Sequence, residues 1–357
     1  MLLAKNRLLE LLEHLSTQAR VYVPARLEVA SLAGESTDSG TLSHFVQYAA
    51  GVQPDFELVN TTLPPKDMLF PQTQKMYRYG FDTDGVPYID PIHDADEVVV
   101  FGLRSCDMAS IDCMDQVFLT KGYEDEFYAP RRQKLLCVAL ACGQAAESCF
   151  CDSMGIDPNV AANADIQLVA GDEAFSLSAQ TEKGQAALSQ WQAFLSAGEL
   201  PVAPAPTSCS LKVEANGLKD KLEQMYEHPL WEQISKKCLT CGTCTFVCPT
   251  CHCFDISQSN RMQMGERFRS WDSCMFFDYT EMAGHHNPRA AKMPRVRQRF
   301  MHKLCFFEER YGCSLCVGCG RCVAQCPVAL DITVLIDQIG AAPLDEKQDV
   351  EGAVHAG

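Results

Sequence analysis

The chain has 357 residues, which is long enough for two domains that each bury a core. Its formal net charge of −16 argues against general nucleic-acid binding, because phosphates attract basic surfaces. It contains 20 Cys and no run of 18 apolar residues, and we expect no signal peptide. We therefore expect a cytoplasmic protein with metal-bound thiols and no membrane span.

The N-terminal half has the pattern of an α/β domain. The apolar runs at 97–103 and 134–140 are typical of buried parallel strands, and a helix between them at 107–118 would complete a βαβ unit. The other predicted elements are a helix at 6–18, a strand at 21–24, an extended loop at 61–73, a hairpin at 166–177 and a helix at 181–195.

The C-terminal half is predicted to be helical. Residues 198–210 contain three prolines and little periodicity, which indicates a linker. We therefore place an α/β domain at 1–205, a second domain at 206–340 and a mobile tail at 341–357. From position 218 onward the pattern is helical between cysteine runs, so we expect the second domain to be an α-helical dicluster ferredoxin domain.

Two cysteine runs with the same spacing lie in this second domain. Each reads C-x2-C-x2-C-x3-C-P, at 238–249 and 316–327. In two-cluster ferredoxins such runs ligate [4Fe–4S] clusters, and the fourth cysteine of each run binds the other run's cluster. Structural zinc is the alternative, but a zinc site has no use for two proline-tailed runs. We predict two clusters, held by Cys238, Cys241, Cys244 and Cys326 and by Cys316, Cys319, Cys322 and Cys248.

Four further cysteines could form a third site. Cys106 follows the first apolar strand, Cys142 follows the second, and Cys149 and Cys151 lie on the next loop. Adjacent parallel strands end at one edge of a sheet, where α/β proteins bind ligands. These thiols are therefore candidate ligands of a third cluster or a metal ion. The alternative is that they are ordinary buried apolar residues.

Other residues near the runs have weaker signals. We interpret Cys251, Cys253 and Cys274 as buried thiols beside a cluster, although they could supply an alternative ligand, and we expect His252 to pack or lie at the surface. Residues 289–303 contain six basic side chains and no acidic one. They could offset cluster charge, dock an acidic partner or form a solvated helix face. We interpret the remaining cysteines as structural: Cys113, Cys137, Cys209, Cys305 and Cys313.

Several longer stretches resemble one family. HPLWEQISKKCLTCGTCTFVCPTCHCFDI, SWDSCMFFDYTEMAG and CVGCGRCVAQCPVALDI are similar to the dicluster [4Fe–4S] subunits of cytoplasmic hydrogenases and sulfhydrogenases (their beta subunits) and to the iron–sulfur subunit of anaerobic sulfite reductase. The resemblance continues upstream in PPKDMLFPQTQ, FGLRSCDMASIDCMDQVF and SCFCDSMG, and covers 63–336. One departure is His285, where the family tends to have glycine.

The resemblance implies an electron-transfer subunit without catalytic residues. It would relay electrons between an FAD- and NAD(P)H-binding reductase subunit and a terminal catalytic subunit of hydrogenase, sulfite reductase or heterodisulfide reductase type. The chain has no G-x-G-x-x-G loop after its apolar strands, no phosphate-binding loop and no G-x-S-x-G elbow. The alternatives are a redox enzyme whose N-terminal domain binds its own flavin or substrate, and a non-redox scaffold.

Overall fold

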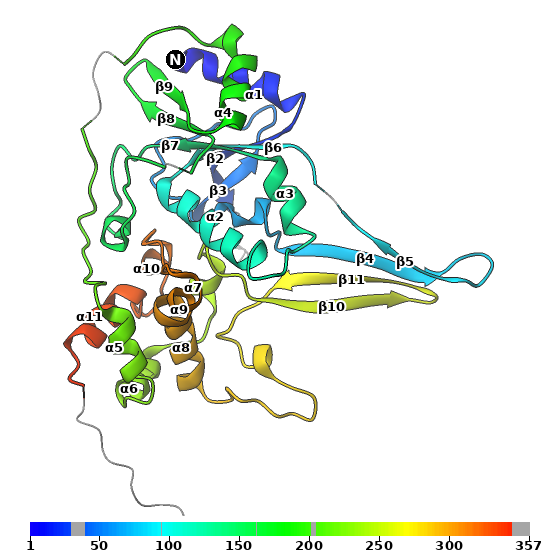
Figure 1. Ribbon diagram of the computed structural model, residues 1–357, viewed down its shortest axis with the longest axis vertical. Coiled ribbons are helices and arrows are strands. Elements are labelled where there is room, and N and C mark those ends of the chain that lie inside the picture. Colours follow the sequence, from blue (N-terminus) through cyan, green and yellow to red (C-terminus); the bar gives the residue numbers. More distant parts are fainter. Residues whose placement is uncertain (30–39, 94, 162, 201–204, 345–357) are drawn as a thin grey trace, which may run out of the picture.

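The computed structural model describes residues 1–29, 40–93, 95–161, 163–200 and 205–344, and Figure 1 shows how their elements are arranged. Positions 201–204 of the predicted linker lie outside the described residues, as does the predicted tail from 345 onward. In the described part, no helix is both long enough and apolar enough to cross a membrane.

A mixed seven-stranded sheet forms the N-terminal half. Its four central strands are parallel, and the strands at both edges are antiparallel to their neighbours. In spatial order the strands are β1 (Leu2–Ala4), β9 (Ala174–Ala179), β8 (Ile166–Ala170), β7 (Leu135–Leu140), β6 (Val98–Leu103), β2 (Arg20–Val29) and β3 (Gly40–Gln47).

Helices pack on both faces of this sheet, because successive strand residues point to opposite sides. In β6, Val99 and Phe101 join the apolar core under two helices, and Val100 joins the core under two others. The first pair of helices is α1 (Leu8–Ser16) and α4 (Glu182–Gln190), and the second is α2 (Ser105–Phe118) and α3 (Tyr128–Lys134).

The main elements predicted for this half are confirmed. The apolar runs at 97–103 and 134–140 form the parallel strands β6 and β7, joined through α2 and α3. The hairpin at 166–177 is β8–β9. Strand β2 is longer than predicted, because its residues 22–29 pair with β3, whereas only residues 20–22 pair with β6.

A second sheet has four antiparallel strands drawn from both halves of the chain. Its order is β10-β11-β4-β5. Figure 1 shows the two hairpins side by side, extending away from the seven-stranded sheet. The strands are β4 (Thr73–Phe81), β5 (Pro87–Pro91), β10 (Phe254–Arg261) and β11 (Met264–Trp271).

This sheet overturns the predicted fold class. The segment between the cysteine runs contains a β-hairpin, so the second half is not an all-helical ferredoxin domain, and the first half contributes strands to both sheets. Periodicity missed β10 because most of its side chains are exposed, which leaves no apolar alternation. The hairpin is stabilised through β11, which pairs with the far-upstream strand β4.

The helices of the C-terminal half enclose a separate apolar core that contains Trp231, Phe300 and Leu335. Two very short helices lie inside the cysteine runs, α7 (Thr243–Phe246) and α10 (Arg321–Ala324), and they pack against each other. The other helical elements are α5 (Leu218–Gln224), α6 (Leu230–Lys237), α8 (Lys292–Met301), a π-helical turn at His302–Phe306, α9 (Phe307–Tyr311) and α11 (Ile332–Ala341).

Candidate iron–sulfur centres

The two cysteine runs have the same backbone geometry. In each run, the residues immediately before and after the second cysteine have positive φ: Thr240 (54°) and Gly242 (76°), then Gly318 (59°) and Gly320 (75°). Glycine adopts this conformation without steric strain, which explains three of the four residue types. A four-residue helix then begins after Gly242 and after Gly320. The sequence repeat is therefore also a structural repeat.

This geometry directs backbone amides at the sulfurs. The Thr240 amide donates to Cys238 Sγ at 3.3 Å, and the Leu330 amide donates to Cys326 Sγ at 3.2 Å. The amide of Gly318 donates in the same way to the thiol of Cys316. Hydrogen bonds of this kind stabilise a thiolate and tune the potential of a cluster that the thiolate binds.

One enclosed cavity brings the fourth cysteine of the first run to the second run. Cys248 lines it together with Cys316, Cys319 and Cys322, and the apolar side chains of Phe150 and Ile332 help to close it. These four thiols are those predicted to hold the second cluster. Four cysteine thiols around a closed space are the set of ligands that holds a [4Fe–4S] cluster.

The first run lies closer to the surface. Cys241 is exposed, and the neighbouring Leu239 is 61% exposed. Cys238 and Cys244 are half-buried, as is Cys326, which follows α10. Helix α10 packs on α7, so the short helices inside the two runs lie against each other.

A buried lysine faces the cavity from the π-helical turn. Lys303 is almost fully buried, lines the cavity and donates a hydrogen bond to Thr250. Burial lowers the pKa of its ammonium, but neighbouring thiolates, Cys248 foremost, raise that pKa more, so the net shift is upward. A buried cation destabilises a protein unless an anion lies beside it. The site is therefore built to hold negative charge.

Two more buried cations surround the runs. Arg299 lines the same cavity, and the Cys244 and Cys322 thiolates raise its pKa against the opposing effect of burial. Lys66, from the N-terminal half, donates to the Cys251 carbonyl oxygen at 2.9 Å and lies 4.0 Å from the ring centroid of Trp271. Sequence reasoning missed Lys66, because nothing local distinguishes it from a surface lysine.

The basic segment at 289–303 therefore turns several of its cations inward. Arg295, Arg299 and Lys303 are buried. The interpretation as a solvated helix face is wrong for these three, and their burial favours the interpretation that the segment offsets cluster charge.

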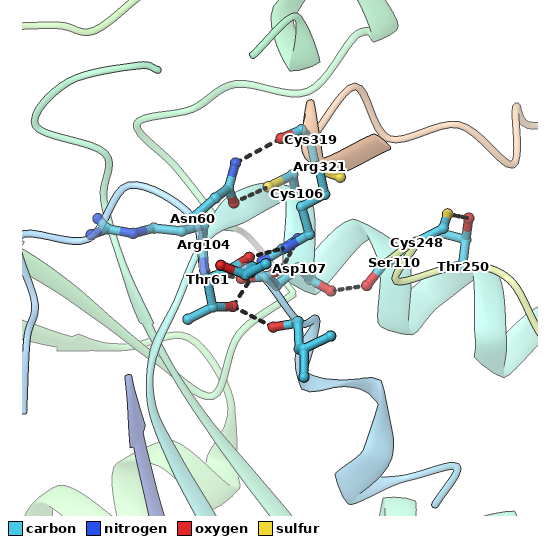
Figure 2. Close-up of polar contacts among 12 residues, drawn as sticks. Asn60, Thr61, Arg104, Cys106, Asp107, Ser110, Cys248, Thr250, Cys319 and Arg321 are labelled. Carbon is cyan, nitrogen blue, oxygen red and sulfur yellow. Dashed lines mark hydrogen bonds and ion pairs between the residues drawn. The ribbon is translucent and has the colours of Figure 1, made fainter. Parts of the chain in front are cut away.

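The N-terminal half is bonded directly to the second run, as Figure 2 shows. Asn60 donates to the Cys319 carbonyl oxygen at 2.6 Å, and its Oδ1 lies 3.9 Å from Cys106 Sγ. Arg321 forms an ion pair with Asp107 and donates to the Thr61 carbonyl oxygen at 2.8 Å. The second run thus depends on both halves of the chain for its position.

The four N-terminal cysteines lie in one region. Cys106, Cys149 and Cys151 belong to one buried apolar cluster, and Cys142 is half-buried after β7. A further thiol, Cys209, lies with its Sγ 3.7 Å from Cys151 Sγ. Sequence reasoning took Cys209 as structural because the segment around it has no periodicity. Metal binding by the predicted four stays a prediction.

The cysteines that flank the first run form a compact group of thiols. Cys253 shares a hydrogen bond with Cys274, which lowers the pKa of Cys253 to about 6. Burial lowers the pKa of His252 to about 4, so this ring is neutral at pH 7, and its Nδ1 lies 2.9 Å from the Thr250 carbonyl oxygen. His252 therefore packs, as expected.

Among the described residues, no three or more Cys, His, Asp or Glu side chains are arranged to hold a single metal ion. This holds for the cysteine runs too. The thiols around a four-iron cluster bind four different iron atoms, so they need not converge on one point.

Comparisons with known proteins agree with this geometry. A family described as "4Fe-4S dicluster domain" matches residues 237–330, which contain both runs. The chain is 29% identical over 292 residues to sulfhydrogenase 2 subunit beta of Pyrococcus furiosus, covering 79% of this chain and 84% of that protein. No solved structure matches significantly. Residues 237–330 therefore match a 4Fe–4S dicluster domain, and most of the chain is similar to a sulfhydrogenase beta subunit, which together support an iron–sulfur electron-transfer role.

Proposed function

We propose that the chain binds two [4Fe–4S] clusters and relays electrons between a flavin subunit that reacts with NAD(P)H and a terminal catalytic subunit. The first cluster would be held by Cys238, Cys241, Cys244 and Cys326, and the second by Cys316, Cys319, Cys322 and Cys248. The observation that carries this proposal is the cavity in which Cys248 faces the three cysteines of the other run. When bound, the clusters supply one-electron transfer.

The surrounding residues have distinct tasks in this proposal. Backbone amides donate to the sulfurs and hold them in place. Arg299 and Lys303 balance the negative charge of the second cluster. Phe150 and Ile332 exclude water from its cavity, which strengthens the attraction between the cations and the thiolates.

The two runs differ in exposure, so the two proposed clusters differ in how closely a partner subunit can approach them. Cys241 is exposed, whereas Cys248 and Cys319 are buried. A partner subunit would therefore exchange electrons most directly through the first run. The relative is a sulfhydrogenase subunit, which favours a hydrogenase-type catalytic partner. The 20 Cys of the chain favour a reducing, cytoplasmic location, where thiols stay available for iron.

The test is metal analysis of the anaerobically purified full chain. We expect at least about eight irons and as many acid-labile sulfides per chain, with EPR signals after dithionite reduction. Cys248→Ala should remove about four irons, whereas Cys305→Ala, a buried cysteine outside both runs, should remove none. Zinc without iron in a fully metallated sample would contradict the proposal.

A further inference from the structure

Two buried thiols meet beside the second cysteine run, outside the cavity of Cys248. Cys151 lies on the loop after β7, and Cys209 lies on the segment that enters the C-terminal half. Their sulfurs are 3.7 Å apart, too far for a disulfide, and both side chains are buried. Two thiols from different parts of the chain are thus held together without a covalent bond.

The segment that carries Cys209 is fixed by a series of hydrogen bonds. The Cys209 amide donates to Asp152 Oδ2 at 2.9 Å. Thr207 and Asn159 bond reciprocally, with the Thr207 amide donating to Asn159 Oδ1 at 2.7 Å and Asn159 Nδ2 donating to the Thr207 carbonyl oxygen at 3.0 Å. These bonds hold the irregular segment against the loop after Cys151 and thereby fix the position of the Cys209 sulfur.

Two more thiols complete the group. Cys149 is buried in the same apolar cluster as Cys151 and Cys209. Cys142 is half-buried at the end of β7, where its amide donates to the Pro158 carbonyl oxygen at 3.0 Å. Burial raises the pKa values of Cys142, Cys149 and Cys151, and the neighbouring thiols of the group add to that rise.

Cys106, in contrast, is directed toward other residues. Its Sγ lies 3.9 Å from Asn60 Oδ1, and after burial the charges of Asp107 and Cys319 do most to raise its pKa. We therefore separate Cys106 from the group, although the sequence pattern had included it.

The group lies directly against the second run. The Phe150 amide donates to the Gly318 carbonyl oxygen at 2.9 Å. A Cβ added at Gly318 would lie 2.5 Å from Cys151 Cα, and one added at Gly320 would lie 2.2 Å from the Ser148 carbonyl oxygen. Only glycine permits this approach, so the two glycines of the run join it to the loop that carries Cys149 and Cys151.

We propose that Cys142, Cys149, Cys151 and Cys209 hold a third [4Fe–4S] cluster, which extends the relay from the second run into the N-terminal half. The inference rests on the proposed function, because the second cluster of that proposal is the neighbour with which the third cluster would exchange electrons. Four thiolates this close repel one another, and a cluster removes that repulsion. Each transfer moves one electron from a reduced centre to an oxidised one without making or breaking a bond, and the reduced flavin of the partner subunit is the electron source.

The first test is the metal content of the wild-type chain. Anaerobic reconstitution to saturation should give about twelve irons and twelve sulfides per chain. About eight irons would leave the proposed function intact and overturn the third cluster, whether the remaining thiols are free, oxidised to a disulfide or bound to zinc. About four irons or none would instead contradict the proposed function.

The second test uses matched variants. Cys151→Ala and Cys209→Ala should each lower the iron content to about eight while the EPR signals of the other two clusters remain. Cys137→Ala, a buried cysteine within β7, should keep about twelve. Twelve irons in both site variants would overturn the assignment. If a variant fails to fold, the wild-type iron count still decides.

Discussion

Arg321 and Asp107 form an ion pair of 2.8 Å between Nη1 and Oδ1, and both side chains are at most 2% exposed. Arg321 begins α10 inside the second cysteine run, and Asp107 lies in the first turn of α2. The pair therefore connects the seven-stranded sheet with the candidate second cluster. Its energetic importance can be measured, because a buried charge without its partner is strongly destabilising.

We predict that Arg321→Met destabilises the chain by about 3–5 kcal/mol, since it leaves the Asp107 carboxylate buried and unpaired. The measurement is chemical denaturation under anaerobic conditions, monitored by circular dichroism. The control is Arg7→Met, which removes an exposed pair with Glu10 and should change the free energy of unfolding by at most about 1 kcal/mol. Equal effects of the two substitutions would show that the buried pair has no special structural role.

Lys303→Met should lower the reduction potential of the second cluster. Reduction adds negative charge to the cavity, and Lys303 is a buried cation on its wall. We expect a shift of about −60 mV, which is a tenfold change in the equilibrium for one electron. EPR-monitored redox titration is the measurement. Lys303→Arg keeps the charge and should keep most of the potential, whereas a rise in potential for Lys303→Met would contradict the electrostatic role.

The purified, flavin-free chain should not be reduced by NADH or NADPH, because its apolar strands are not followed by a dinucleotide-binding loop. Dithionite should bleach its visible absorbance, and adding the flavin partner should make NAD(P)H effective. Stopped-flow absorbance gives the rate in each case. Direct reduction by NADH would favour the alternative of an enzyme with its own nucleotide site.

His285→Gly should stabilise the chain. His285 is exposed and has φ of 62°, in the left-handed region that glycine enters without strain. Removing this backbone strain should raise the free energy of unfolding by on the order of 1 kcal/mol. That increase corresponds to a rise in Tm on the order of 1–2 °C. His286→Gly is the control, because His286 does not have positive φ and should gain nothing. A lower Tm for His285→Gly would show that the contact between His285 and Glu281 outweighs the strain.

The sequence predicted the features that depend on local spacing. Each cysteine run fixes three thiols within seven residues, so its geometry follows from a short motif, and the apolar runs of β6 and β7 are equally local. The fold class failed at β10, whose exposed residues form a strand only because β11 pairs with the distant β4. Lys66 and Cys209 were missed for the same reason, since each reaches its position by the packing of segments far apart in sequence.

The shared sheet also has a consequence for biosynthesis. Strand β4 pairs with β5 on one side and with β11 on the other, from Thr73 opposite Ser270 to Gly80 opposite Met264. While the ribosome is still making the residues between β5 and β11, one edge of β4 has no partner and is open to pairing with another nascent chain. Cys248 leaves the ribosome shortly before β10, and the second run leaves it later still. All strands of this sheet are therefore available before the cavity can close, so a chaperone that shields β4 would act on a chain that cannot yet hold either cluster.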